Sequence, residues 1–179
     1  MLEPEVTFKI CIFGDGGVGK TTLTRRYLSG FFEMDTKMTL GAEIFVKYVS
    51  VKDMKVVLQI WDFGGEDMFR FLLPAYSRGS SGGIFMYDIT RYQSLKKLDD
   101  WIKTFKEGLT EKEKQIPILI VGGKLDLQEK RSVLAEDTVN LLKSDNLFDH
   151  IECSAKSGEN VELVFETLVR KMLENTNLN

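Results

Sequence analysis

The sequence has few of the residues that build disulfide-rich or zinc-binding proteins. It contains two cysteines, Cys11 and Cys153, which do not form a Cys-x-x-Cys pair, and one histidine, His150. These numbers argue against a disulfide framework and against a metal site of cysteine and histidine. We therefore expect both cysteines to be buried free thiols. For His150, which has no ligand-like neighbours, we expect a surface or capping role.

Long apolar runs and a basic stripe are also missing. No run approaches the ~20 residues that cross a bilayer, and the acidic segment 1–5 is not typical of a signal peptide. Lys and Arg (24) are interleaved with Asp and Glu (27), giving a formal charge of −3, which argues against nucleic-acid binding. The chain ends without a Cys-a-a-X box, and residue 2 is Leu. We expect no lipid anchor in this chain and a cytoplasmic location.

Strand-like and helix-like segments alternate along the chain, whose 179 residues suit one domain spanning 1–179. Apolar and β-rich runs predict strands at 6–13, 43–51, 55–61, 82–87, 116–121 and 150–153. Helical patterns fall at 20–28, 67–77, 95–105, 134–147 and 161–172. The short 52–54 linker predicts a hairpin. The expected fold is α/β: a six-stranded, mostly parallel sheet with one antiparallel strand and helices on both faces.

The segment Gly14–Thr21 joins the first predicted strand to the first predicted helix, and it matches the pattern Gly, four residues, Gly-Lys-Ser/Thr. Its glycines allow backbone N–H groups to surround a phosphate, and the helix N-terminus adds positive potential. Lys20 would reach the outer phosphates, and the Thr21 hydroxyl would bind Mg²⁺. The alternative is a glycine-rich turn that binds nothing. The predicted phosphate-loop residues are Gly14, Asp15, Gly16, Gly17, Val18, Gly19, Lys20 and Thr21.

Two further loops could complete the phosphate and metal site, because ligands of such sheets bind beyond the carboxyl ends of the strands. Asp62 follows the third predicted strand and could hold Mg²⁺ through a water, while the Gly65 N–H could bond a γ-phosphate. Thr39 lies in the loop before the second strand, and its hydroxyl could complete the Mg²⁺ shell. Read singly, each is also consistent with an ordinary loop residue.

A base-binding pocket is predicted after the last two strands. The carboxylate of Asp126 could accept bonds from guanine N1–H and N2–H₂, a pair that adenine does not offer. The stem of Lys124 could lie across the ring, the Ala155 N–H could reach guanine O6, and Ser154 could brace Asp126. Each segment alone could be a surface turn. Their order along the chain, each after a predicted strand, favours a nucleotide site.

From about Phe8 to Met172 the chain resembles the Ras superfamily of small GTPases, and the stretches 69–70, 75–79 and 87–90 resemble its Rab branch. The resemblance implies a P-loop NTPase G domain that binds GTP or GDP with Mg²⁺ and hydrolyses GTP. Its switch regions would be about 33–43 and 63–76, contacting effectors, exchange factors and GTPase-activating proteins, and the chain would be a monomer. It also implies that Thr22 joins the phosphate contacts, that Phe32 packs on the base edge, and that Lys156 joins the guanine pocket. The implied metal-binding residues are Thr21, Thr39 and Asp62, and the implied catalytic residues Lys20, Gly65 and Glu66.

The chain departs from the family pattern at two positions. Glu66 stands where Gln usually follows Asp-x-x-Gly. That glutamine orients the attacking water by donating and accepting, whereas a carboxylate only accepts and adds negative charge, so we expect slow unaided hydrolysis. A carboxylate could instead act as a base or pair with a partner's arginine. Gly123 stands where Asn or Thr usually begins the motif Asn-Lys-x-Asp. The missing side chain removes a hydrogen bond toward guanine N7 and a tie to the phosphate loop. Such a loss costs on the order of 1 kcal/mol, or roughly tenfold in nucleotide affinity.

Two other functions remain open from the sequence. One is a nucleotide-binding scaffold with little or no hydrolysis, to which Glu66 points. The other is a P-loop ATPase or kinase, against which Asp126 and the segment 154–156 argue. No arginine finger is evident in the sequence itself, so we expect one from a partner.

Overall fold

One six-stranded sheet organises the protein, in the spatial order β2-β3-β1-β4-β5-β6. The computed structural model describes residues 6–34, 37–143 and 146–176. Strands β1 (Val6–Phe13), β3 (Met54–Phe63), β4 (Gly82–Asp88), β5 (Ile118–Gly123) and β6 (Leu147–Glu152) run parallel, while β2 (Ala42–Val51) is an antiparallel edge strand. The predicted strand number and the hairpin are confirmed.

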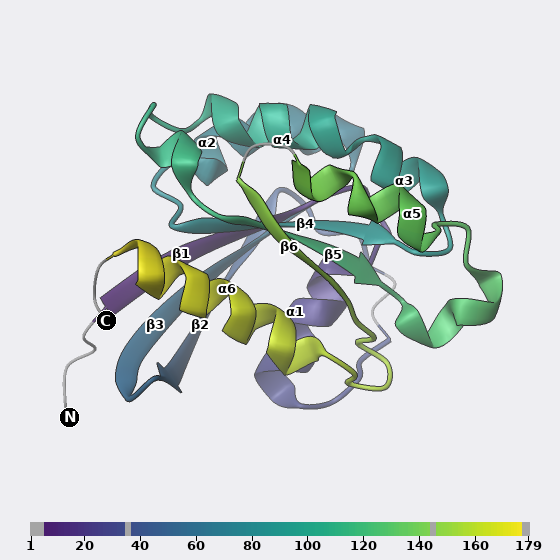
Figure 1. Cartoon of the computed structure of the whole chain (residues 1–179), viewed down its shortest axis with the longest axis horizontal. Helices are drawn as coiled ribbons and strands as arrows, with labels where there is room; N and C mark the ends of the chain where they lie inside the picture. The colour runs from purple at the N-terminus through teal and green to yellow at the C-terminus, as the bar shows by residue number, and fades with distance from the viewer. Residues whose placement is uncertain (1–5, 35–36, 144–145, 177–179) are drawn as a thin grey trace.

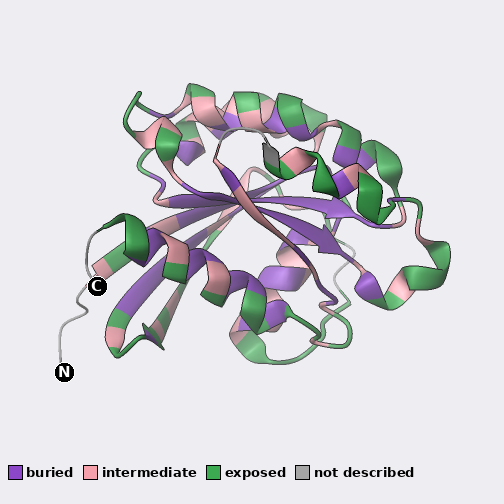
Figure 2. Ribbon diagram, viewed as in Figure 1, coloured by how far each residue is buried: buried purple, intermediate pink, exposed green. Residues whose placement is uncertain are grey.

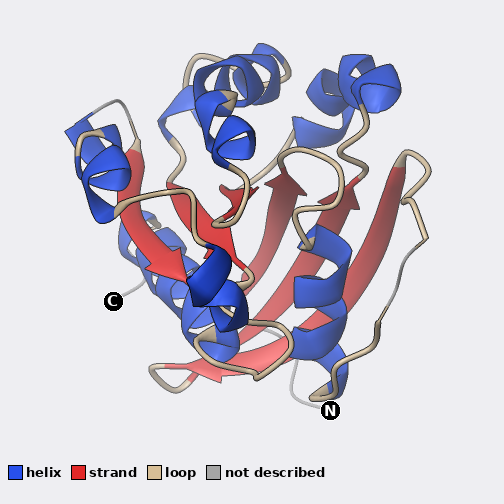
Figure 3. Cartoon of the chain, turned by 90° about the vertical axis from the view of Figure 1, so that its right-hand side faces the viewer, coloured by secondary structure: helices blue, strands red, loops and turns tan. Residues whose placement is uncertain are grey.

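Helices cover both faces of this sheet, as Figures 1 and 3 show. Helices α1 (Lys20–Ser29) and α6 (Val161–Asn175) lie on one face. The other face carries α2 (Leu73–Ser77), α3 (Tyr92–Lys96), α4 (Leu98–Glu107) and α5 (Ala135–Val139). The 3₁₀ segments are η1 (Asp67–Leu72), η2 (Glu113–Gln115), η3 (Leu125–Lys130) and η4 (Leu141–Lys143). The expected α/β architecture is therefore confirmed.

Each face of the sheet has its own apolar core. Beneath α1 and α6, the Tyr27 and Phe165 rings stack with centroids 3.8 Å apart. On the other face, Phe13 and Phe105 stack at 4.5 Å, and Trp101 is fully buried. The central strands β4 and β5 are buried along their whole length (Figure 2), which explains why they read as continuous apolar runs. This rigid centre holds the strand ends in place.

Several predicted boundaries are wrong, most clearly the helix expected at 134–147. The chain forms only α5 and η4 there, and Leu147 opens β6 opposite Ile118. Residues 144 and 145 lie outside the described part. Leu147 fits a helical apolar face in the sequence, but pairing with β5 buries it as a strand residue. Sheet pairing, which the local pattern does not contain, decides its conformation.

Other elements shift for local reasons. The helix expected at 67–77 begins as the 3₁₀ segment η1, and the one at 95–105 is divided into α3 and α4 at Lys97. The strand expected from 116 begins at Ile118, directly after Pro117, which cannot donate to a sheet ladder. The last predicted strand starts three residues earlier than His150. In the described part of the chain, none of the helices has the length and apolarity required to traverse a bilayer.

The rare residues lie inside the fold. Cys11 and Cys153 are buried free thiols, as expected, and burial raises the pKa of both to about 12. His150 is half-buried rather than a surface or capping residue. Its Nε2 lies 2.8 Å from the Tyr87 hydroxyl, and the two rings stack. Burial, the largest effect, lowers the pKa of His150, which is consistent with a neutral ring packed in the structure.

Candidate functional site

The loops that follow β1, β3, β5 and β6 all lie at one edge of the sheet, because the parallel strands end there. The loop between β1 and α1 forms its centre. Gly14 and Gly19 have φ of 141° and 104°, which L side chains rarely adopt. A Cβ on Gly14 would also meet the Met86 carbonyl. Glycine is therefore required at both positions for the loop to turn into α1.

Lys20 begins α1 with its ammonium group buried inside this loop. Its Nζ donates to the carbonyl oxygens of Gly14 (2.9 Å) and Asp15 (2.7 Å). Burial lowers the pKa of Lys20 to about 8, although the neighbouring carboxylates of Asp62, Asp15 and Glu66 oppose that shift. The negative charge of a phosphate group next to Nζ would offset this effect of burial and favour the charged ammonium. The position suits a charge that meets an anionic ligand.

The three residues predicted to bind Mg²⁺ come together beside the loop. The Thr21 hydroxyl donates to Asp62 Oδ2, and its oxygen lies 2.8 Å from the Thr39 hydroxyl. Asp62 is fully buried, and its Oδ1 has no hydrogen-bond partner in the described structure. Burial raises the pKa of Asp62 to about 6, against the opposing effects of the Thr21 hydrogen bond and Lys20. An oxygen-only donor set with an unsatisfied buried carboxylate oxygen fits a hard cation such as Mg²⁺.

The loop after β3 lies directly on the phosphate loop. The Gly65 carbonyl accepts a 3.0 Å bond from the Gly16 N–H, and a Cβ on Gly65 would overlap backbone atoms of Gly14, Asp15 and Gly16. The Glu66 carboxylate lies against Gly16 at the place where a Cβ on Gly16 would point. The Gly65 contact to a γ-phosphate stays a prediction. The geometry does place Gly65 and Glu66 at the outer side of the phosphate loop.

A separate cavity of about 320 Å³ opens beside the phosphate loop, a size suited to a small molecule. Ser154 Oγ donates to Asp126 Oδ1 at 2.7 Å, which is the brace that the sequence predicts. The cavity wall contains Phe32 and the predicted guanine-pocket residues, apart from the buried Ser154. It is lined by Val18, Gly19, Thr22, Phe32, Met34, Met86, Lys124, Asp126, Leu127, Ala155 and Lys156.

Comparison with known proteins identifies the family of this chain. Residues 9–174 match the Ras family. The chain is 35% identical to the Ras-related protein Rab-19 of Xenopus laevis, over 93% of this chain and 76% of that protein. It is 32% identical to human Ras-related protein Rab-30, over 100% and 86%, and 32% identical to Ras-related protein RABA4b of Arabidopsis thaliana, over 97% and 75%. The chain belongs to the Ras family. This membership supports a GTP-binding regulatory switch, and Ras and Rab proteins are in general GTPases.

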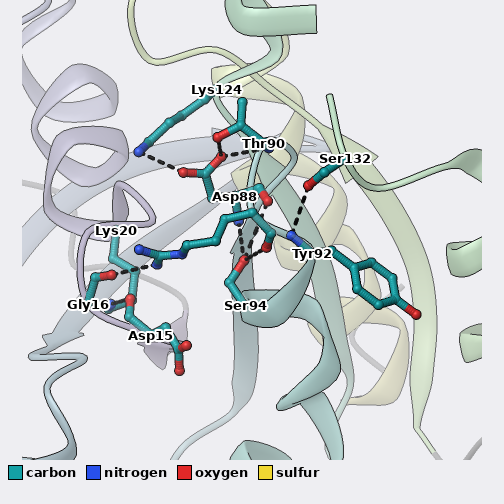
Figure 4. Close-up of polar contacts among 10 residues, drawn as sticks. Asp15, Gly16, Lys20, Asp88, Thr90, Tyr92, Ser94, Lys124 and Ser132 are labelled. Carbon is teal, nitrogen blue, oxygen red and sulfur yellow. Dashed lines mark hydrogen bonds and ion pairs between the residues drawn. The ribbon is translucent and has the colours of Figure 1, made fainter. Parts of the chain in front are cut away.

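One contact in this Ras-family site escaped the sequence analysis. Lys124, expected to lie along the base, forms a 2.7 Å ion pair with Asp88 at the end of β4, and Thr90 donates to the same carboxylate (Figure 4). Burial would raise the pKa of Asp88, but the hydrogen bonds from Lys124 and Thr90 outweigh it, so the net pKa is lowered. The feature of the sequence that points to this contact is a carboxylate, Asp88, at the end of a buried strand. The ion pair with Asp88 therefore orients the side chain of Lys124, which lines the cavity.

A second missed network holds the phosphate loop from behind. Trp101 in α4 donates its indole N–H to Asp15 Oδ1 at 2.8 Å, and Lys97 pairs with Asp15 Oδ2 at 3.0 Å. The Arg91 guanidinium, just before α3, donates to the Gly16 carbonyl at 2.7 Å. Asp15 lies 86 residues before Trp101, so no sequence pattern joins them. These contacts tie the loop to the α3–α4 segment.

Replacing Trp101 with phenylalanine is expected to destabilise the protein by about 1–3 kcal/mol, because the buried Asp15 carboxylate loses a donor. Chemical denaturation monitored by circular dichroism measures the change. The matched control is Trp61→Phe, since the buried Trp61 Nε1 has no hydrogen-bond partner in the described structure. Equal losses in the two variants would contradict a specific role for the Trp101–Asp15 bond.

Proposed function

We propose that this Ras-family chain is a guanine-nucleotide switch that binds GTP or GDP with Mg²⁺ and hydrolyses GTP. The observation that carries the proposal is the meeting of two residues at Thr21 beside Lys20: Thr39, from the loop before β2, and Asp62, near the end of β3 and directly before the loop that follows it. A γ-phosphate and its cation would tether both loops at this point, and hydrolysis would release them. The switch segments are about 33–43 and 63–76. Residues 35 and 36 lie outside the described part of the chain.

The proposed mechanism is in-line attack of water on the γ-phosphorus, with electrostatic stabilisation by the protein. Lys20 places its charge on the outer phosphates, the loop amides of 14–19 surround the β-phosphate, and the Gly65 N–H faces the γ-phosphate. Glu66, at the outer side of the loop, accepts a hydrogen bond from the water. Thr21, Thr39 and, through water, Asp62 would hold Mg²⁺, which when bound neutralises phosphate charge.

Partner binding is proposed at the switch segments. Large apolar side chains stand exposed on both, including Met38 and Leu40 in the first and Met68 and Phe71 in the second. The outer face of the adjoining β2 adds Ile44 and Val46. Exposed apolar clusters of this kind mark protein-binding surfaces. We propose that effectors, exchange factors and GTPase-activating proteins contact them, one of which supplies an arginine.

Several further expectations from the sequence stay predictions for this protein. They concern its organisation as one domain over 1–179, its monomeric state, its cytoplasmic location, and the absence of a nucleic-acid partner. The detailed roles of the site residues are also predictions. Each follows from the sequence or from the family, and none is needed for the binding test below.

Chromatography of the nucleotide released from the purified protein tests the proposal. We expect stoichiometric guanine nucleotide with Mg²⁺. GDP would indicate turnover of GTP, whereas GTP would indicate slow hydrolysis and favour the scaffold function to which Glu66 points. Neither nucleotide in the protein, with no uptake of added GDP, would contradict the assignment. Displacement of bound nucleotide by ATP would instead indicate a P-loop ATPase or kinase.

A further inference from the structure

The cavity beside the phosphate loop has an unusual back wall where β4 and β5 end. Gly123, one of the two residues that depart from the family pattern, pairs with Asp88 in the parallel β4–β5 ladder. A Cβ built on Gly123 would overlap Met86 Cε and lie 3.0 Å from the Val18 carbonyl oxygen. The backbone at Gly123 has no positive φ in the structure, so a side chain would be permitted there by conformation. Glycine is therefore needed at position 123 because the neighbouring atoms leave no room for a Cβ, and not because of backbone strain.

Met86 fills that space with its side chain. The residue is 2% exposed, yet it lines the cavity together with Val18 and Gly19. Its Cε lies 3.6 Å from the position that a Cβ on Gly19 would occupy, which places the methyl group beside the phosphate loop. A thioether adapts well to irregular gaps and makes dispersion contacts with the atoms around it. The Met86 side chain, which comes from β4, therefore occupies the place beside the phosphate loop that a side chain at position 123 of β5 would take.

We propose that Met86 is a positioning residue of the nucleotide site, packed into the place left by Gly123 so that it supports Val18 and Gly19 from behind. This rests on the proposed function and deepens it. The loss of a polar side chain at 123 is then matched by an apolar contact to the same loop. Met86 and Gly123 act as a pair, and neither can be changed alone without disturbing the loop.

The packing of Met86 against Gly123 predicts that asparagine at position 123, the usual residue of the family, weakens GDP binding rather than strengthens it. Restoring asparagine with Gly123→Asn should speed the dissociation of GDP about three- to tenfold, since the new Cβ displaces the Met86 methyl and presses on the Val18 carbonyl. The open space next to Met86 is the cavity itself, so a displaced methyl competes with the nucleotide. Met86→Val should also speed dissociation, but by less, because it leaves a gap behind Gly19.

The double variant Met86→Val, Gly123→Asn should dissociate GDP no faster than the wild type, giving a coupling of at least about threefold in a double-mutant cycle. Dissociation of a fluorescent GDP analogue in Mg²⁺ measures all four proteins. Gly123→Ala separates packing from hydrogen bonding: it should speed dissociation with Met86 present and not with Met86→Val. Thermal unfolding of the nucleotide-free proteins shows whether any change is confined to the nucleotide site or reflects general stability.

The matched control is the neighbouring Gly122→Ala. A Cβ there meets the Tyr87 hydroxyl and Glu152 on the opposite face of the sheet, so its effect should add to that of Met86→Val without coupling. Additive effects of Gly123→Asn and Met86→Val, or slower dissociation in Gly123→Asn alone, would overturn the proposal. A wild type that binds no guanine nucleotide would overturn the proposed function instead, and the two failures are therefore distinguishable.

Discussion

Replacing Asp126 with asparagine is expected to weaken GDP binding on the order of a hundredfold to a thousandfold. A carboxylate accepts both donors on the guanine edge, whereas an amide offers one acceptor and sets its own N–H₂ against the other donor. Charge-assisted hydrogen bonds contribute about 1.5–3 kcal/mol each, and a hundredfold corresponds to about 2.7 kcal/mol. The fold should persist, since Asp126 is exposed at the cavity and an asparagine oxygen can still accept the Ser154 bond.

Titration calorimetry with nucleotide-free protein and Mg²⁺ measures this change. Xanthosine diphosphate presents N1–H beside a carbonyl oxygen, which matches the acceptor and donor of an amide, so the variant should gain affinity for it. Glu129→Gln, an equivalent loss of charge at an exposed position of the same 3₁₀ segment, should leave both affinities unchanged. Unchanged GDP binding by Asp126→Asn would refute the assignment of this cavity to the base.

The parts of the site that the sequence predicts correctly are those attached to strand ends. Thr21, Asp62 and Asp126 each follow a recognisable apolar strand, and parallel strands bring such residues to one edge of the sheet. Glycines that need positive φ, such as Gly19, are also visible in the sequence because the residue type itself reports the conformation. The periodicity of α6, in which Val161 and Leu168 are buried, depends only on local spacing.

The features that the sequence does not predict depend on distant contacts. Leu147 becomes a strand residue because Ile118 pairs with it, and no local pattern reports that pairing. The Asp15–Trp101 bond joins two residues that lie 86 positions apart in the sequence. Met86 reads as an ordinary buried strand residue, and only the packing shows its side chain at the place vacated at Gly123. Side-chain placement of this kind follows from the whole fold.

Replacing Glu66 with glutamine is expected to raise the rate of unaided GTP hydrolysis by tenfold or more, which corresponds to about 1.4 kcal/mol in the barrier. Glu66 extends from the loop after β3 to the outer side of the phosphate loop, against Gly16 and near Lys20. A carboxylate there faces the negative charge of the γ-phosphoryl group and cannot donate a hydrogen bond. Glutamine removes the charge and both donates and accepts.

Single-turnover hydrolysis of preloaded GTP, started with Mg²⁺, measures the chemical step apart from nucleotide exchange. The neighbouring Asp67→Asn removes the same charge from an exposed position and should leave the rate unchanged, so a general charge effect can be recognised. Equal rates for the wild type and Glu66→Gln would show that residue 66 does not limit hydrolysis. A slower variant would show that the carboxylate serves as a base for the attacking water, and the position would then be an alternative catalytic solution to the glutamine of the family.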